Sequence, residues 1–216
     1  MNRPWALGGI VLVAMIFALS ALMYPRLPDP MPMHWDLLGN PDGQIARAWG
    51  AFLVPGVAAG FWLLLLVLPR LSPREFPMEP FARQWRAFEY AVLGFLLFSQ
   101  WLMLHAAASQ RPLPTRLFQV GLGVLLIAVG NPFGKTTRNF FFGIRTPWTL
   151  ASEEVWLRTH RLAGKLVVAA GALVAVAAFF DLGTLVILPA VVLVLLISVV
   201  SSYVIYRRVQ AAETTR

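Results

Sequence analysis

Six long apolar stretches, nearly free of charge, constrain this chain more than any other feature. The first, residues 5–24, holds 20 residues without a charged side chain. At about 1.5 Å per residue, a helix of that length crosses the roughly 30 Å hydrocarbon core of a bilayer. The other stretches cover residues 49–68, 88–108, 117–130, 162–180 and 182–206. Together they predict an all-α integral membrane protein with six transmembrane helices.

The composition supports this fold class. Charged residues make up 13% of the chain and hydrophobic residues 58%, whereas soluble domains carry roughly 25% charged residues. The chain has no cysteine, which excludes a disulfide scaffold, a thiolate metal site and a cysteine nucleophile. We interpret residues 5–24 as a retained helix and not a signal peptide, because the apolar run exceeds the usual signal core of about 7–15 residues.

The basic residues predict how the helices are oriented. If the N-terminus is cytoplasmic, 14 of the 18 lysines and arginines lie on the inner side and 4 on the outer side. The inner residues are Arg3, Arg70, Arg74, Arg83, Arg86, Lys135, Arg138, Arg145, Arg158, Arg161, Lys165, Arg207, Arg208 and Arg216. This split follows the positive-inside rule and predicts an N-in/C-in, multi-pass protein of the inner or plasma membrane. It also accounts for the net charge of +8, so we expect no direct binding of nucleic acid.

The predicted helices divide the chain into three parts. Residues 1–68 form a two-helix unit with an outer loop, residues 69–116 hold a middle helix, and residues 117–216 hold three helices. Small residues predict close helix packing at two places, because they let helix backbones approach within a bilayer. These are Gly56 and Gly60, in a GxxxG pattern, and the stripe Gly164, Gly171, Ala175 and Ala178. We expect this packing within the chain, with a dimer interface as the alternative.

The outer loop of the first unit is rich in turn-forming residues. Four prolines between positions 25 and 32 exclude a helix there, and the run Asn40-Pro41-Asp42-Gly43 predicts a turn. His34, Asp36 and Asp42 are candidates to gather around a cation, but zinc requires three or four ligands with supporting partners. We therefore expect His34 and Asp42 to brace the loop by hydrogen bonds, and we expect no metal or other cofactor.

The inner loop between the fourth and fifth apolar stretches carries most of the remaining polar chemistry. Ser152 is a predicted N-cap, and Glu154 and Arg158 have the spacing of an ion pair on one helix face. Aromatic residues alternate with glycine and cations before this helix, which fits either an anchor in the headgroup region or a recognition surface. The polar side chains that favour recognition are Asn139, Arg145, Thr146, Thr159, His160 and Arg161.

Three of those residues predict a basic pocket. Arg145 offers a planar fork of donors, and we expect His160 and Arg161 to face the same surface one helical turn beyond Trp156. Such a pocket would suit an acidic protein segment, a lipid phosphate or the carboxylate of Glu89. The last alternative is an internal clamp.

The same loop resembles the signature of the SdpI-like immunity protein family. The matching segments are Asn131-Pro132 through Asn139, Gly143-Ile144-Arg145-Thr146-Pro147-Trp148-Thr149-Leu150, Glu154-Val155-Trp156, Thr159-His160-Arg161 and Gly164-Lys165. In the outer loop, Pro32-Met33-His34-Trp35 with Gly39 and Asp42 is similar to the Pro-x-His, Gly-x-x-Asp pattern of an uncharacterised domain at the N-terminus of the same proteins. The signature positions that become candidates for partner binding are Asn131, Lys135, Asn139, Gly143, Arg145, Thr146, Trp148, Trp156, Thr159, His160 and Arg161. The outer motif adds His34, Gly39 and Asp42.

The resemblance implies a six-helix bacterial membrane protein that gives immunity to a secreted peptide toxin. In the best-known member, the toxin-bound protein also signals by sequestering a cytoplasmic repressor at the membrane. The implied partners are membrane lipid, a peptide toxin on the outer side and a cytoplasmic repressor protein.

The ionisable residues and the motifs bear on two other classes of function. A small transporter or channel component is the alternative, although Glu89, His105 and Lys165 lie near the ends of their predicted spans, where an ionisable side chain can reach the interface. An enzyme is not expected, because the chain contains no HExxH motif, no GxSxG motif and no paired aspartates within the spans.

Overall fold

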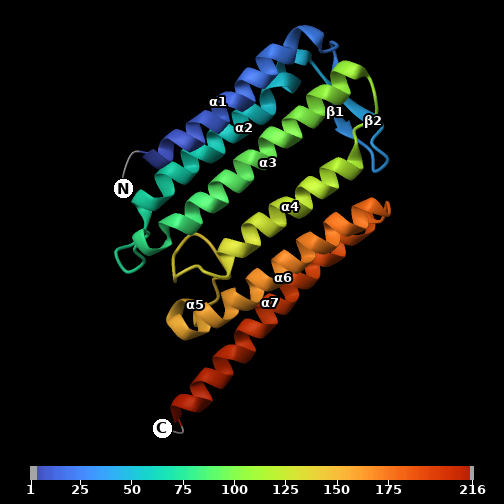
Figure 1. The fold of residues 1–216 in the computed structure, drawn as a ribbon. Coiled ribbons are helices and arrows are strands. Elements are labelled where there is room, and N and C mark those ends of the chain that lie inside the picture. The colour runs from blue at the N-terminus through green and yellow to red at the C-terminus, as the bar shows by residue number, and fades with distance from the viewer. Residues whose placement is uncertain (1–3, 215–216) are drawn as a thin grey trace.

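The computed structural model of the chain describes residues 4–214 and contains six helices long and apolar enough to cross a membrane (Figure 1). They are α1 (Pro4–Met23), α2 (Arg47–Val67), α3 (Ala82–Ser109), α4 (Thr115–Phe133), α6 (Glu153–Phe179) and α7 (Gly183–Thr214). The prediction of an all-α fold with six membrane helices is confirmed. Helix α4 is longer than the stretch 117–130 that defined it, and Arg3 and Arg216 of the charge count lie outside the described residues.

Shorter elements connect these helices. They are the 3-10 turns η1 (Tyr24–Arg26), η2 (Leu68–Leu71) and η3 (Glu79–Phe81), the strands β1 (Met31–Trp35) and β2 (Pro41–Ile45), and the one-turn helix α5 (Pro147–Ala151). Helix α6 starts at Glu153 and continues through the predicted fifth span, with the Ser152 side chain accepting a bond from the Val155 amide at 3.4 Å. The predicted N-cap is thereby confirmed.

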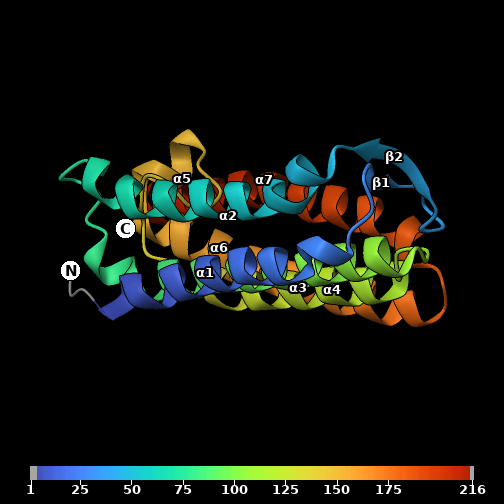
Figure 2. The same ribbon diagram turned by 90° about the horizontal axis from the view of Figure 1, so that it is seen from above.

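The helices run alternately in opposite directions, so the connections gather at two ends of the bundle (Figure 1). One end, called here the hairpin end, carries β1 and β2, the α3–α4 connection and the α6–α7 turn. The opposite end, called the basic end, carries the α2–α3 connection and the long α4–α6 loop. Helices α1, α2 and α3 form one group and α4, α6 and α7 another, and α3 packs against α4 where the groups meet (Figure 1). The view from above shows the two ends again, with the strands at one and α5 near the other (Figure 2).

Glycines bring the backbones of α4 and α6 into contact. A Cβ added to Gly164 would lie 2.7 Å from the Gly134 nitrogen, and one added to Gly123 would lie 2.6 Å from the Gly171 oxygen. Both distances are far below van der Waals contact, so a larger side chain would force the helices apart. The predicted packing of the stripe is confirmed at Gly164 and Gly171.

The prediction that the GxxxG pattern in α2 packs against another helix of the same chain is wrong. A Cβ built on Gly56 or Gly60 meets no atom within 4 Å. The spacing of two glycines does not say whether a neighbouring helix passes over them, and here none of the described helices does.

The outer loop folds into a two-stranded hairpin that sequence analysis did not predict. Strands β1 and β2 pair antiparallel, and Met31 is fully buried against a cluster that includes Leu27, Ala51 and Leu104. The Leu113 amide donates to the Gly39 oxygen at 2.8 Å, which docks the hairpin onto the α3–α4 connection. The hairpin is therefore part of the bundle and not a free excursion of the chain.

The turn of this hairpin lies earlier than predicted. Pro41, Asp42 and Gly43 belong to β2, while the chain reverses between Asp36 and Asn40. The Asp36 carboxylate accepts from the Leu38 and Asn40 amides at 2.9 and 2.8 Å, and Gly39 has φ of +89°. The turn therefore forms at Asp36 and Gly39 and not at the Asn-Pro-Asp-Gly run, because Asp36 binds local amides and Gly39 adopts a positive φ.

Candidate recognition loop at the basic end

The α4–α6 loop, residues 134–152 and called here the signature loop, is ordered around the side chain of Asn139. Its Oδ1 accepts from the amides of Phe141 and Phe142 at 3.0 and 2.7 Å, and its Nδ2 donates to the Thr137 and Phe142 carbonyls at 3.0 Å each. The side chain is fully buried. Asparagine fits this position because its side-chain amide has both a donor, Nδ2, and an acceptor, Oδ1, and both form hydrogen bonds here.

His160 and Trp156 of α6 hold the loop in place through hydrogen bonds to its backbone. The Trp156 indole donates to the Thr136 carbonyl at 3.0 Å, and the Ile144 amide donates to His160 Nε2 at 2.9 Å. Nδ1 of His160 lies 2.8 Å from the Trp156 carbonyl, so the proton sits on Nδ1 and Nε2 accepts. The two rings stack with centroids 4.0 Å apart, and both side chains are fully buried.

Gly143 is required where the loop passes His160. Its φ is +129°, and a Cβ at this position would overlap the His160 Nε2 atom. Only glycine adopts this backbone conformation without strain and leaves the imidazole its place.

The end of the loop is a capped turn tied to α7. Thr146 and Thr149 form a capping box at the start of α5, and Thr149 also donates to the Ile144 carbonyl at 2.7 Å. The Trp148 indole donates to Ser202 of α7 at 2.9 Å. Thr136, Thr149 and Ser202 also belong to this network and were not predicted, although the run Thr146-Pro147-Trp148-Thr149 has the residue types of a helix start.

The eleven predicted signature residues therefore separate by exposure into three groups, of which Gly143, Thr146 and Trp148 are the half-buried one. Four of them are buried: Asn139, Trp156, Thr159 and His160. Asn139, Trp156 and His160 hold the loop in shape by hydrogen bonds, whereas the Thr159 hydroxyl has no hydrogen-bond partner among the described residues. Four are exposed and face outward: Asn131, Lys135, Arg145 and Arg161. The Phe140 ring is 41% exposed and lies 5.5 Å from the Arg145 guanidinium, so the exposed face of the loop at these two residues is basic and aromatic.

The predicted pocket of Arg145, His160 and Arg161 does not form as one unit. His160 is fully buried while Arg161 is exposed, so the two do not face one surface. The Arg145 guanidinium donates to the Phe140 carbonyl and lies 5.5 Å from the centroid of the Phe140 ring. The internal clamp to Glu89 is also wrong, because neither carboxyl oxygen of Glu89 has a hydrogen-bond partner among the described residues.

The outer motif lies at the hairpin end, across the bundle from the signature loop. His34 Nδ1 and Asp42 Oδ1 are 2.5 Å apart, which confirms that this pair braces the loop. Backbone hydrogen bonds from Asn40 lower the pKa of Asp36, and this carboxylate serves the turn. Between residues 4 and 214, no three His, Asp or Glu side chains gather as a metal site.

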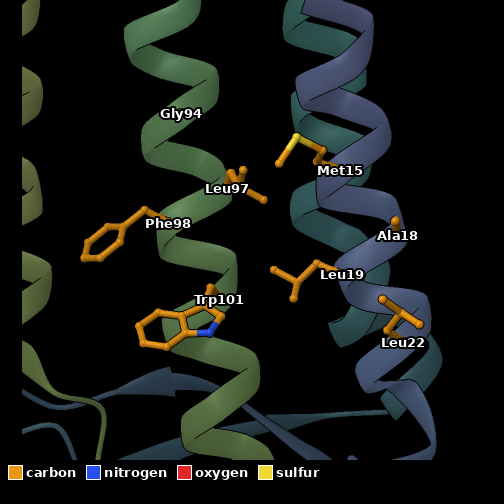
Figure 3. A pocket seen from close by; sticks show the side chains of 8 residues that line it. All are labelled: Met15, Ala18, Leu19, Leu22, Gly94, Leu97, Phe98 and Trp101. Carbon is orange, nitrogen blue, oxygen red and sulfur yellow. The ribbon is translucent and has the colours of Figure 1, made fainter.

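A third feature is an apolar groove of about 490 Å³ between α1 and α3 (Figure 3). Its walls are Met15, Ala18, Leu19, Leu22, Gly94, Leu97, Phe98 and Trp101. No charged residue lines it, so it offers no chemistry beyond that of a surface facing lipid acyl chains.

Six membrane-length helices and an ordered polar loop define a multi-pass α-helical membrane protein. A sequence profile of the SdpI/YfhL protein family matches residues 135–204, and a domain of unknown function (DUF1648) matches residues 11–59. The chain is 30% identical over 208 residues to "Immunity protein SdpI" of Bacillus subtilis (strain 168), covering 94% of this chain and 97% of that protein. The chain therefore belongs to the SdpI/YfhL protein family.

A second relative matches only the N-terminal region. "Uncharacterized membrane protein YbgB" of Bacillus subtilis (strain 168) is 39% identical over 49 residues, or 23% of this chain and 52% of that protein. No solved structure gives a significant match. The two profile matches separate the chain into the hairpin region and the signature region, which are also the two candidate sites.

Proposed function

We propose that this chain is a membrane immunity protein that protects its cell from a secreted peptide toxin. The observation that carries the proposal is the similarity to Immunity protein SdpI over nearly the full length of both proteins. Because both the hairpin region and the signature loop fall within that alignment, the two ends of the bundle are candidates for two different partners.

The hairpin end is the proposed contact for the toxin. The turn presents Leu37 and Leu38, which are 75% and 79% exposed, on a hairpin that is held rigidly by the buried Met31 and by the bond between Leu113 and Gly39. Exposed apolar side chains on a fixed scaffold favour contact with an apolar partner. A membrane-active peptide arriving at the outer interface has this character.

The test is protection of cells that lack Immunity protein SdpI. When such cells express this chain, they are expected to survive the secreted peptide toxin to which the loss of SdpI makes them sensitive. The Leu37→Ser/Leu38→Ser variant is expected to lose protection while accumulating to the same level in the membrane. Replacing Leu193, 55% exposed in α7, with alanine is the matched control and is expected to keep protection. Full sensitivity of cells with normal membrane levels of the unmodified chain would contradict the proposal.

The signature loop is the proposed contact for a cytoplasmic repressor. Buried Asn139 and His160 give the loop one fixed shape, and exposed Arg145 and Phe140 supply a basic and aromatic face suited to an acidic protein segment. Signalling by sequestration at the membrane would use this face.

Recruitment of the repressor can be followed by fluorescence microscopy. A tagged repressor is expected to move to the membrane when toxin is added to cells expressing this chain, and Arg145→Gln is expected to leave it in the cytoplasm. Arg207→Gln removes an exposed charge from α7 at the same end and is expected to leave recruitment intact. If both variants recruit normally, the loop is not the contact.

One observation favours the alternative of a transporter or channel component. Glu89 is fully buried within α3, and neither carboxyl oxygen has a hydrogen-bond partner among the described residues. Ionisable groups at such positions are costly and are associated with ion pathways. Proteoliposomes in a proton or cation flux assay discriminate the two functions: immunity predicts no flux above empty vesicles, whereas transport predicts a flux that Glu89→Gln abolishes.

A further inference from the structure

A groove of about 550 Å³ lies between α4 and α6 at the basic end of the bundle. It differs from the groove between α1 and α3 because its mouth is basic, while the rest of its wall is small and apolar. Its lining residues are Gly130, Asn131, Gly134, Lys135, Arg161, Gly164, Lys165, Val168, Ala169 and Ala172.

The groove follows one face of α6. Arg161, Lys165, Ala169 and Ala172 are three or four residues apart, which places them in a row along the helix. Arg161 and Lys165 are level with the end of α4, since a Cβ on neighbouring Gly164 would lie 2.7 Å from the Gly134 nitrogen. From Lys165 to Ala172 the row runs about 10 Å along the helix, from the end of α4 into the span.

The cations at the mouth are not neutralised within the chain. Glu154 of the same helix pairs with Arg158 at 2.5 Å, and Glu153 lies 3.6 Å from Arg138. Within residues 4–214, Arg161 and Lys165 have no ion-pair partner. Lys135 donates to Asn131 at 3.1 Å, a neutral partner that leaves its charge uncompensated.

We propose that this groove binds one anionic phospholipid. Arg161, Lys165 and Lys135 contact the phosphate, and one acyl chain lies against Gly164, Val168, Ala169 and Ala172. A free phosphate ion would use the cations and leave the apolar wall bare, whereas a phospholipid matches both parts. Basic pockets between membrane helices at the cytoplasmic side bind anionic headgroups in this way.

Two glycines set the floor of the groove. A Cβ added to Gly130 would lie 3.0 Å from the Gly164 oxygen, and one added to Gly164 would lie 2.8 Å from the Gly130 oxygen, so the two backbones meet there and form the floor. The exposed alanines at 169 and 172 leave room above it for a chain of methylene groups. The bound lipid would lie directly beside the signature loop, since Lys135 belongs to both. The inference concerns lipid binding by the purified protein and does not depend on whether the chain gives immunity.

The test uses purified protein in nanodiscs and measures by native mass spectrometry which lipid the protein retains. Protein exchanged from phosphatidylcholine into mixed phosphatidylcholine and phosphatidylglycerol is expected to keep one phosphatidylglycerol through delipidation. The Arg161→Gln/Lys165→Gln variant is expected to bind it about fivefold more weakly for each charge removed. Arg207→Gln/Arg208→Gln removes two exposed charges from α7 at the same end and is expected to bind as the unmodified chain does.

A second variant tests the acyl-chain wall without touching a charge. Ala172→Leu fills the groove and is expected to weaken retention, while Val176→Leu, on an exposed position of α6 outside the groove, is expected not to. Each variant must first show an unfolding temperature in detergent close to that of the unmodified chain. Equal loss in the α7 double variant, unchanged retention in the α6 double variant, or competition by inorganic phosphate at the same concentration as lipid would each overturn the proposal.

Discussion

The backbone amide of Ile144 donates a hydrogen bond to Nε2 of His160, with 2.9 Å between the two nitrogens. This bond joins the signature loop to the first turns of α6, and the imidazole that accepts it is fully buried. A buried amide that loses its only acceptor costs about 1–3 kcal/mol. The histidine of the family signature is therefore explained by loop architecture, and the exposed residues around it are free to serve a partner.

The first prediction follows from this bond. His160→Ala leaves the Ile144 amide without its acceptor and removes the ring that stacks on Trp156, so we expect a loss of about 3 kcal/mol in the free energy of unfolding. His160→Gln keeps an acceptor and should lose less. Thermal unfolding of the purified protein in detergent measures both. If His160→Ala unfolds at the same temperature as the unmodified chain, the histidine does not hold the loop.

The sequence predicts those features of the fold that depend on residues close together in the chain. The six apolar stretches, the Ser152 cap and the Glu154–Arg158 pair depend on residues close in the chain, and all are present. The GxxxG pattern of α2 is equally local, but whether it is used depends on which helix passes over it. That information is not contained in the spacing of Gly56 and Gly60.

The candidate site shows the same division. The signature residues were identifiable by resemblance, but their separation into buried and exposed groups was not, because polarity suggests exposure for both His160 and Arg161. Only the fold shows that both ring nitrogens of His160 form hydrogen bonds with backbone groups. The hairpin turn was misplaced for a related reason: Asp36 binds two amides at once, which composition alone does not rank above Asn-Pro-Asp-Gly.

The second prediction compares two glycines. Gly143→Ala places a methyl group against His160 Nε2 at a φ of +129°, and we expect a loss of roughly 1–3 kcal/mol. Gly56→Ala is the matched control, because a Cβ there meets nothing within 4 Å and alanine is the better helix former. Its unfolding temperature should be unchanged or slightly higher. Equal destabilisation by the two variants would mean that the close approach at Gly143 is not what constrains the loop.

The third prediction concerns pH and the hairpin turn. Because backbone bonds from Asn40 lower the pKa of Asp36 below its ordinary value of 3.8, the charged form is favoured in the folded state. Its stabilising contribution is therefore complete above 3.8 and is lost as the pH falls through the lower, folded-state pKa. Asp36→Asn cannot titrate, so the difference in unfolding temperature between it and the unmodified chain should shrink on acidification below that range. A difference that stays constant with pH would show that the carboxylate charge does not stabilise the turn.

The fourth prediction is the N-in/C-in topology, which the alternation of charged loops indicates. The chain has no cysteine, so single reporter cysteines give an unambiguous signal. Asn40→Cys and Gln110→Cys, both exposed at the hairpin end, should react with an impermeant maleimide in intact cells. Glu79→Cys and Phe140→Cys at the basic end should react only after permeabilisation.

Glu79 is a better position for a reporter cysteine than neighbouring Met78, which is 5% exposed and would stay unlabelled on either side of the membrane. Labelling of the cysteine at position 140 in intact cells would place the signature loop outside, and the loop could then not recruit a cytoplasmic repressor.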